Sequence, residues 1–289
     1  MQGDRSGRAW ARRALAARLR RVAGEGSWRL AYQPVVELAS GRTVGAEALL
    51  RWPEDVRGEV EAGRFIPLSE ELGLISALGA WVVAELSRRC ASWRAEGLLD
   101  AMTTLTFNLS PSELWHPALM DRLASLQDAT GRGDLLVAEI TESSLSMDPA
   151  RACAILQDIR ELGIRVALDD FGTGYSSLAR LQHLPIDVLK IDRSFLDGVE
   201  HDPRARSIVS AMIRLALGLD IVPLAEGIET GAQLRFVSDQ GCPLGQGFLF
   251  DPAISAVSFA EGMLLGYPGF FGHPSEGAIH EGVGVAVVR

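Results

Sequence analysis

The chain has 289 residues, of which 47% are hydrophobic and 22% charged, and its formal net charge is −9. This length and composition are typical of a globular protein with one large domain or two small ones. The acidic balance argues against duplex nucleic acid as the main partner, because duplex binding needs clustered lysines and arginines.

Three sequence features bear on location. The three cysteines are scattered and form no CxxC pair, which favours a reducing compartment. No uninterrupted apolar stretch is long enough to cross a bilayer, and the arginine-rich N-terminus lacks the apolar core of a signal peptide. We therefore expect a cytoplasmic protein without an integral membrane segment.

Residues 1–27 carry seven arginines interleaved with alanine and leucine. The spacing of the apolar residues between Trp10 and Val22 predicts a helix. Its apolar face is thin and rich in alanine, so we interpret it as a basic linker helix that leads into the domain. The alternative is a helix that binds an anionic membrane or a partner.

The next segment predicts a β-hairpin at residues 28–50. Two strand-like runs, 28–38 and 43–50, flank a short turn at Ser40–Arg42, so the pair should be antiparallel. Glu47 stands out in the second run because alanines flank it. Residues 53–63 are expected to form a charged loop.

From there the chain alternates between helices and strands. A helical region is predicted at 67–97, with a break near Gly73. Further strands are predicted at 104–108, 135–139, 165–168, 188–192, 221–225 and 247–250, with helices at 112–130, 148–162, 202–218, 230–240 and 252–265. Alternation of this kind predicts βαβ units. Together with the hairpin it makes about eight strands, so the fold class is α/β, a TIM-type (β/α)₈ barrel with an antiparallel first strand. The barrel should span 28–265, and the Gly-rich residues 266–289 should form a tail.

Nearly every predicted strand ends in a residue that can bind a cation or transfer a proton. In a parallel barrel the carboxyl ends of the strands meet on one face, where such barrels carry their active sites. Each residue has an ordinary explanation by itself: Asp192 as a helix cap, Asn108 as a turn residue, Lys190 as a surface lysine. Their coincidence favours a site built from Glu47, Asn108, Glu139, Asp169, Asp170, Lys190, Asp192, Glu226 and Gln246.

The candidate metal ligands offer only oxygen: Glu47, Asn108, Glu139, Asp169, Asp170 and Glu226. Such a set favours Mg²⁺ or Mn²⁺ over Zn²⁺. Five carboxylates are too many for one Mg²⁺, so we expect two ions that share a carboxylate of the Asp169–Asp170 pair. Two-metal sites suit in-line displacement at phosphorus, with Lys190 orienting the water or stabilising charge. We interpret the glycine-rich residues 171–175 as a mobile lid beside these ligands, rather than as a phosphate cradle or a tight turn.

Seven motifs together resemble the EAL domain family, from about Leu30 to Pro252. They are GAEALLRW at 45–52, NLSP at 108–111, EITES at 139–143, ALDDFGTGYSSL at 167–178, LKIDRSF at 189–195, AEGIET at 225–230 and GQGF at 245–248. The resemblance implies a barrel phosphodiesterase that uses Mg²⁺ or Mn²⁺. Its reaction would be hydrolysis of cyclic-di-GMP to linear pGpG, by attack of a metal-bound water on a phosphodiester.

The resemblance also implies a role for each residue. One metal would be held by Glu47, Asn108, Glu139 and Asp169, and the second by Asp169, Asp170 and Glu226. The catalytic residues would be Lys190, which positions the water, with Glu226 and Asp192; the substrate would contact Gln33, Leu49, Arg51 and Gln246. A lid at Gly172, Thr173 and Gly174 would be anchored by Glu142, with Glu229 an outer acid. The family couples this lid to dimerisation, so a homodimer is a further expectation. Phe248, where tyrosine is commoner, and the ending at 250–252 depart from the family pattern.

Two other functions compete with hydrolysis. One is a catalytically silent receptor for cyclic-di-GMP, or a protein-interaction scaffold; such proteins usually lack some metal ligands, and here all are present. The other is a Mg²⁺-dependent lyase of the enolase type, which also pairs strand-end acids with a lysine but leaves the Asp169–Asp170 pair unexplained.

Overall fold

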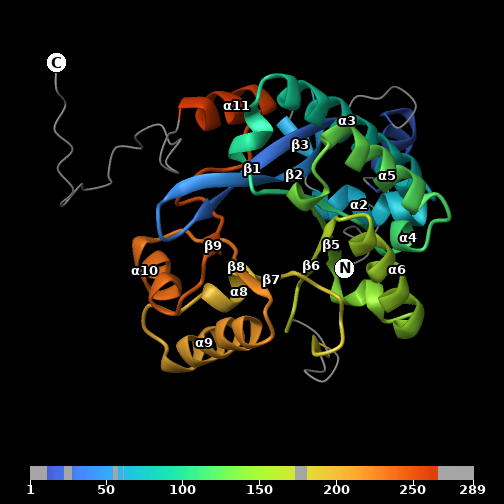
Figure 1. The fold of residues 1–289 in the computed structure, drawn as a ribbon. Coiled ribbons are helices and arrows are strands. Elements are labelled where there is room, and N and C mark those ends of the chain that lie inside the picture. Colours follow the sequence, from blue (N-terminus) through green and yellow to red (C-terminus); the bar gives the residue numbers. More distant parts are fainter. Residues whose placement is uncertain (1–11, 23–27, 55–57, 61, 173–180, 266–289) are drawn as a thin grey trace, which may run out of the picture.

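The structure, a computed structural model, describes residues 12–22, 28–54, 58–60, 62–172 and 181–265 (Figure 1). Eight strands close into a ring in the order β1-β9-β8-β7-β6-β5-β4-β2, and β2 pairs back with β1. The β1–β2 pair is antiparallel, whereas β2 pairs with β4 in parallel. The predicted TIM-type barrel with an antiparallel first strand is thus confirmed. The ring strands are β1 (Arg29–Glu37), β2 (Arg42–Glu54), β4 (Thr104–Asn108), β5 (Leu136–Thr141), β6 (Arg165–Asp169), β7 (Val188–Ile191), β8 (Val222–Ala225) and β9 (Leu244–Gly245).

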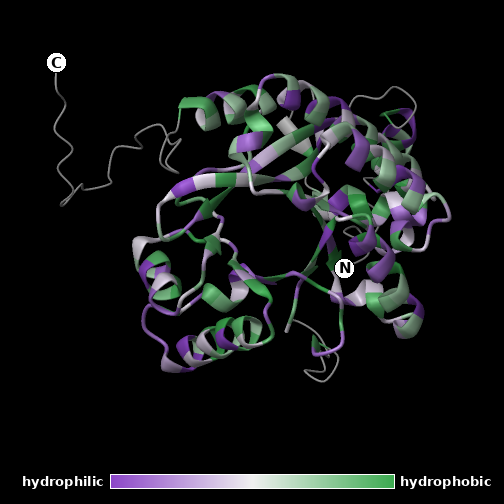
Figure 2. Ribbon diagram, viewed as in Figure 1, coloured by the Kyte–Doolittle hydropathy of each residue, from purple (hydrophilic) through white to green (hydrophobic). Residues whose placement is uncertain are grey.

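Helices surround the barrel (Figure 1). Green and purple residues alternate along them in Figure 2, as expected of helices with one face on the barrel and one in solvent. No helix among the described residues is long and apolar enough to cross a membrane. Besides the helical residues 12–22, the helices are α2 (Ala62–Glu71), α3 (Ile75–Ala95), α4 (Pro111–Leu114), α5 (Leu119–Thr130), α6 (Pro149–Glu161), α8 (Arg193–Leu196), α9 (Pro203–Gly218), α10 (Gly231–Asp239) and α11 (Ala256–Leu265), with 3₁₀ turns η1 (Leu98–Ala101), η2 (Gly133–Leu135) and η3 (Glu142–Leu145).

Helix starts follow the local sequence closely. Asp148 and Asp202 each cap a helix whose first residue is proline, and each carboxylate accepts a backbone N–H of the first turn. Thr230 and Gln233 form a capping box at the start of α10. These starts were predicted from the same residues.

Three predicted elements were wrong in extent. The helix expected at 112–130 is divided into α4 and α5, because Pro117 lacks an N–H and disfavours helical geometry at the residue before it. The loop expected at 53–63 is shorter, since β2 runs to Glu54 and pairs with β3 (Gly58–Val60). The helix expected from residue 67 begins at Ala62, although its break near Gly73 is confirmed.

The strand expected at 247–250 is also wrong, because the last strand, β9, is Leu244–Gly245. The following residues turn back on themselves: the backbone N–H groups of Phe250 and Asp251 both donate to the Gly247 carbonyl. A chain that forms these local bonds cannot extend the sheet.

Strand alternation sorts the barrel interior into layers. Val137, Val188 and Leu224 belong to a small apolar cluster with Val35 and Ala167. Side chains repeat their direction every two residues, so the residues two positions further along the chain, within β5 and β7 and directly after β8, point to the same side. These are Glu139, Lys190 and Glu226, which places a polar layer directly after an apolar one.

The N-terminal segment packs on the barrel. Residues 12–22 are helical, and Leu19 and Val22 are buried in an apolar cluster with residues of β2, α2 and α3. The helix is therefore attached to the domain that it was expected to lead into. The predicted tail at 266–289 lies outside the described residues.

Candidate active site

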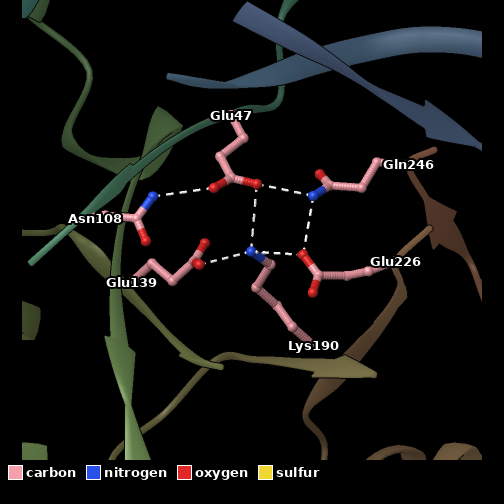
Figure 3. Close-up of polar contacts among 6 residues, drawn as sticks. All are labelled: Glu47, Asn108, Glu139, Lys190, Glu226 and Gln246. Carbon is pink, nitrogen blue, oxygen red and sulfur yellow. Dashed lines mark hydrogen bonds and ion pairs between the residues drawn. The ribbon is translucent and has the colours of Figure 1, made fainter. Parts of the chain in front are cut away.

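A single buried ammonium stands at the centre of the site (Figure 3). Lys190 on β7 lies 2.6 Å from Glu139, 2.7 Å from Glu226 and 3.3 Å from Glu47. These glutamates come from β5, the end of β8 and β2, so only closure of the barrel brings them together. Lys190 is also the only lysine in the chain. Buried charges persist when they are paired and hydrogen-bonded in this way.

Two side-chain amides hold the carboxylates in place. Gln246 Nε2 donates to Glu47 at 2.8 Å and to Glu226 at 2.9 Å, and so bridges two acids that would otherwise repel each other. Asn108 Nδ2 donates to the other oxygen of Glu47 at 3.0 Å. Figure 3 shows that these three contacts and those of Lys190 form one connected network. Each acid is thereby fixed in orientation.

The contacts within this network shift the pKa values of its members in different directions. Burial raises the pKa of Glu226 to about 7, and burial with the neighbouring Glu47 raises the pKa of Glu139 well above its usual value. Burial acts in the same direction on Glu47, but Lys190 and the two amide donors outweigh it and lower its pKa. Burial disfavours the Lys190 ammonium, yet the surrounding carboxylates raise its pKa well above the usual value. The carboxylates around Lys190 therefore favour its charged form.

The remaining predicted metal ligands lie at the end of β6. Burial raises the pKa of Asp170, with the adjacent Asp169 charge acting in the same direction. Asp170 also has a positive φ of 58°, a conformation that non-glycine residues rarely adopt. Such strain at the end of a barrel strand often accompanies a functional site.

Among the predicted metal ligands, Glu139 Oε2 and Asp169 Oδ1 are buried and have no hydrogen-bond partner. Unsatisfied buried oxygens of this kind fit a divalent cation, which takes all-oxygen ligands. However, no group of three His, Cys, Asp or Glu side chains in the described part of the chain is arranged to hold a metal ion. Three of the acids point at Lys190 instead. The oxygen donors and their burial therefore fit a divalent metal, whereas the side-chain rotamers in this structure do not.

A pocket of about 670 Å³ opens at this end of the barrel. Eleven of the predicted site residues line it: Gln33, Glu47, Leu49, Arg51, Asn108, Glu139, Asp169, Lys190, Glu226, Glu229 and Gln246. Its volume is typical of a site for a small organic ligand. Arg51 is half-buried, and burial lowers the pKa of its guanidinium.

Other predicted residues lie at the rim of the pocket or outside its lining. Asp192 caps α8, and its carboxylate accepts the Ser194 N–H at 2.9 Å, so the capping role that we considered is confirmed. Glu229 is half-exposed and pairs with Arg193 at 2.9 Å. Glu142 begins η3, and Gly172 follows β6 with a φ of 91°. Thr173 and Gly174, the rest of the predicted lid, lie outside the described residues.

Sequence reasoning missed the apolar half of the pocket. Ile66 of α2 and Leu78 and Val82 of α3 also line it. Periodicity marks such residues as helix core, and nothing in their type separates a pocket wall from a packed interface. One signal in the sequence could have singled out Lys190 as a functional residue. It is the only lysine, and all other residues of the Lys and Arg types are arginines.

Comparison with known proteins agrees with this geometry. The profile of the EAL domain family matches residues 16–253. The chain belongs to the EAL domain family. It is 40% identical over 224 residues to the bifunctional diguanylate cyclase/cyclic di-GMP phosphodiesterase MucR of Pseudomonas aeruginosa, covering 76% of this chain and 32% of MucR. It is 34% identical over 243 residues to the oxygen sensor protein DosP of Escherichia coli, covering 84% of this chain and 30% of DosP. The chain thus spans about a third of the length of these curated relatives.

Solved structures give the same assignment. The PaMucR phosphodiesterase in complex with c-di-GMP superimposes with a TM-score of 0.78 at 36% identity, covering 85% of this chain and 99% of that one. The EAL enzyme Bd1971 in its cGMP-bound form has a TM-score of 0.82 at 30% identity, covering 89% and 71%. The resemblance noted in the sequence is therefore confirmed.

Proposed function

We propose that this EAL domain hydrolyses cyclic-di-GMP to linear pGpG. The observation that carries the proposal is the buried network around Lys190, in a pocket that apolar side chains also line. A cyclic dinucleotide has both complements: phosphodiesters for a charged end and flat bases for an apolar wall. The related MucR phosphodiesterase domain was solved in complex with c-di-GMP.

The acidic lining of the pocket favours a bound cation. It holds seven acidic side chains, Glu47, Glu70, Glu113, Glu139, Asp169, Glu226 and Glu229, against three basic ones, Arg51, Lys190 and Arg193. A phosphodiester would be repelled there unless further positive charge is bound. Two Mg²⁺ or Mn²⁺ ions would neutralise the phosphate and activate the attacking water when bound. Glu47, Asn108, Glu139 and Asp169 would hold one ion, and Asp169, Asp170 and Glu226 the other.

The protein's own side chains would then orient the reacting groups and stabilise their charge. Lys190, kept protonated by its acids, stabilises negative charge that develops on the phosphate oxygens. Gln246 and Asn108 keep the carboxylates oriented. Gln33, Leu49 and Arg51 contact the substrate from β1 and β2, where Gln33 and Glu47 are paired in register. Asp192, which caps α8, would be the remaining catalytic residue.

The test is direct. The purified chain is incubated with cyclic-di-GMP and Mg²⁺ or Mn²⁺, and pGpG is measured by chromatography. Glu47→Gln and Lys190→Met should each lower the rate by about a hundredfold or more, as removal of a preorganised charge does. Glu161→Gln on the exposed side of α6 is the matched control and should keep the wild-type rate. Tight binding without product under either metal would refute hydrolysis and favour a receptor.

A further inference from the structure

The helix at residues 12–22 is fastened to the barrel through a second apolar core. Leu19 is fully buried there and Val22 nearly so. They pack with three aromatic rings, Trp28, Trp52 and Phe65, whose centroids lie 5.7, 5.6 and 5.8 Å apart. This cluster therefore joins the helix to β2 and α2.

Two surface contacts reinforce the attachment. The Arg18 guanidinium lies 5.5 Å from the centre of the Trp52 ring, a cation–π contact. Arg12 forms an ion pair with Glu71, the last residue of α2. The helix is thus held both to the strand that carries Glu47 and to the end of α2.

The same cluster contributes to the lining of the pocket. Leu78 is a buried member of the cluster and also lines the pocket. Leu50 and Ile66 pack against the cluster from its edge and line the pocket as well. Leu50, Ile66 and Leu78 therefore line the pocket and also belong to, or pack against, the cluster that holds the N-terminal helix. We call these three residues the apolar wall of the pocket.

The α2 helix needs this support. It has ten residues with Pro67 inside, so it is short and lacks one internal hydrogen bond. Its buried residues, Phe65, Leu68 and Ser69, face away from solvent, while Ile66 and Glu70 line the pocket. A helix of this length is held by tertiary packing, and Leu19 supplies part of it.

We propose that helix 12–22 positions the apolar wall of the substrate pocket, and that loosening the helix weakens substrate binding without impairing the hydrolytic centre. Lys190 and its acids are held by contacts among the strand ends and Gln246, and none of these residues belongs to the cluster that holds the helix. The inference rests on the proposed function, because it assigns Ile66 and Leu78 to the base-binding side of that substrate. Leu19 is accordingly a positioning residue.

The experiment separates binding from chemistry in the full chain. Leu19→Ala should raise KM for cyclic-di-GMP about fivefold and leave kcat within about twofold, because binding loses contacts that the reacting phosphate never makes. Leu19→Met keeps the volume and should restore KM. Arg20→Ala, on the exposed face of the same helix, is the control and should match wild type. A folded Leu19→Ala with wild-type KM would overturn the proposal, as would an equal fall in kcat and kcat/KM.

A second variant covers a failure of Leu19→Ala to fold, which circular dichroism would detect. Arg12→Ala/Arg18→Ala removes only the surface contacts and should raise KM about threefold; an unchanged KM would then overturn the proposal. The Kd for cyclic-di-GMP, measured calorimetrically with Mg²⁺ in the Lys190→Met background, should change by the same factors. If wild type binds but does not hydrolyse, the proposed function fails while these Kd values still decide the inference. If it does not bind at all, both fail.

Discussion

Lys190 is buried with 3% of its surface exposed, among carboxylates that come from three strands. A compact ammonium can make three short contacts in different directions, whereas the planar guanidinium of arginine is larger and rigid. All other residues of the Lys and Arg types in the chain are arginines. At the level of the single residue, the three contacts around Lys190 suit a compact ammonium.

Glu113 provides a test of buried charge outside the metal-binding acids. It closes a capping box, accepting the Ser110 N–H at 3.0 Å and the Ser110 hydroxyl at 2.8 Å, and burial raises its pKa. The folded state therefore holds this proton more tightly than the unfolded state, so its ionisation lowers stability as pH rises through the raised pKa. Glu113→Gln keeps an acceptor for both bonds and removes the charge.

We expect Glu113→Gln to melt at a higher temperature than wild type at pH 8, and the difference to shrink as pH falls toward 4. The measurement is a series of thermal melts across this range. Glu161→Gln, exposed on α6, serves as the control and should show a constant difference. A Glu113→Gln curve parallel to wild type at all pH values would contradict the assignment.

At the scale of elements, the turn after β9 places Gln246 between two acids. Gly247 has a φ of 155°, and a Cβ there would lie 2.2 Å from the backbone nitrogen and oxygen of Ile228. The backbone of Ile228 also hydrogen-bonds to the Gln246 carbonyl at 3.0 Å. Close approach of two backbones thus sets the position of Gln246, and only glycine permits it.

Gly247→Ala should therefore lower both stability and activity. Backbone strain and overpacking together predict a loss of about 2–4 kcal/mol in the free energy of unfolding. Chemical denaturation measures it, with pGpG formation as the second readout. In Gly218→Ala, at the end of α9, the added Cβ meets no atom within 4 Å, so stability should stay equal or rise slightly. Equal stability of the two variants would show that the turn can relax.

At the scale of the whole molecule, the acidic side chains that line the pocket should make folding and metal binding interdependent. An ion that binds only the folded state at a hundred times its Kd stabilises it by about 2.7 kcal/mol. For a domain of this size that corresponds to a rise in Tm of about 5–10 °C. We expect this rise on adding Mn²⁺ to metal-depleted protein, and its reversal by a chelator.

Asp169→Asn should reduce the Mn²⁺-induced rise in Tm, because it removes an acid expected to serve both ions. Asp158→Asn, exposed on α6, should retain the full rise. A wild-type Tm that does not respond to Mn²⁺ or Mg²⁺ would contradict the metal assignment.

The boundaries of elements show where prediction from sequence works. Asp148, Asp202 and Thr230 announce helix starts because a cap acts within four residues. The last strand was misplaced because its end depends on the contact between Gly247 and Ile228, and a local sequence pattern does not span the distance between these two positions. The metal ligands were found as strand-end polar residues, and their roles stay predictions.

The sequence by itself determined the barrel, its family and the set of acids with Lys190, because strand period, helix caps and contiguous motifs are local properties. Only the tertiary structure decided that Lys190 lies among Glu47, Glu139 and Glu226, that Gln246 bridges two of them, and that helix 12–22 backs the pocket wall. These relations join residues up to 199 positions apart. Closure of the ring sets such distances, and no local pattern encodes them.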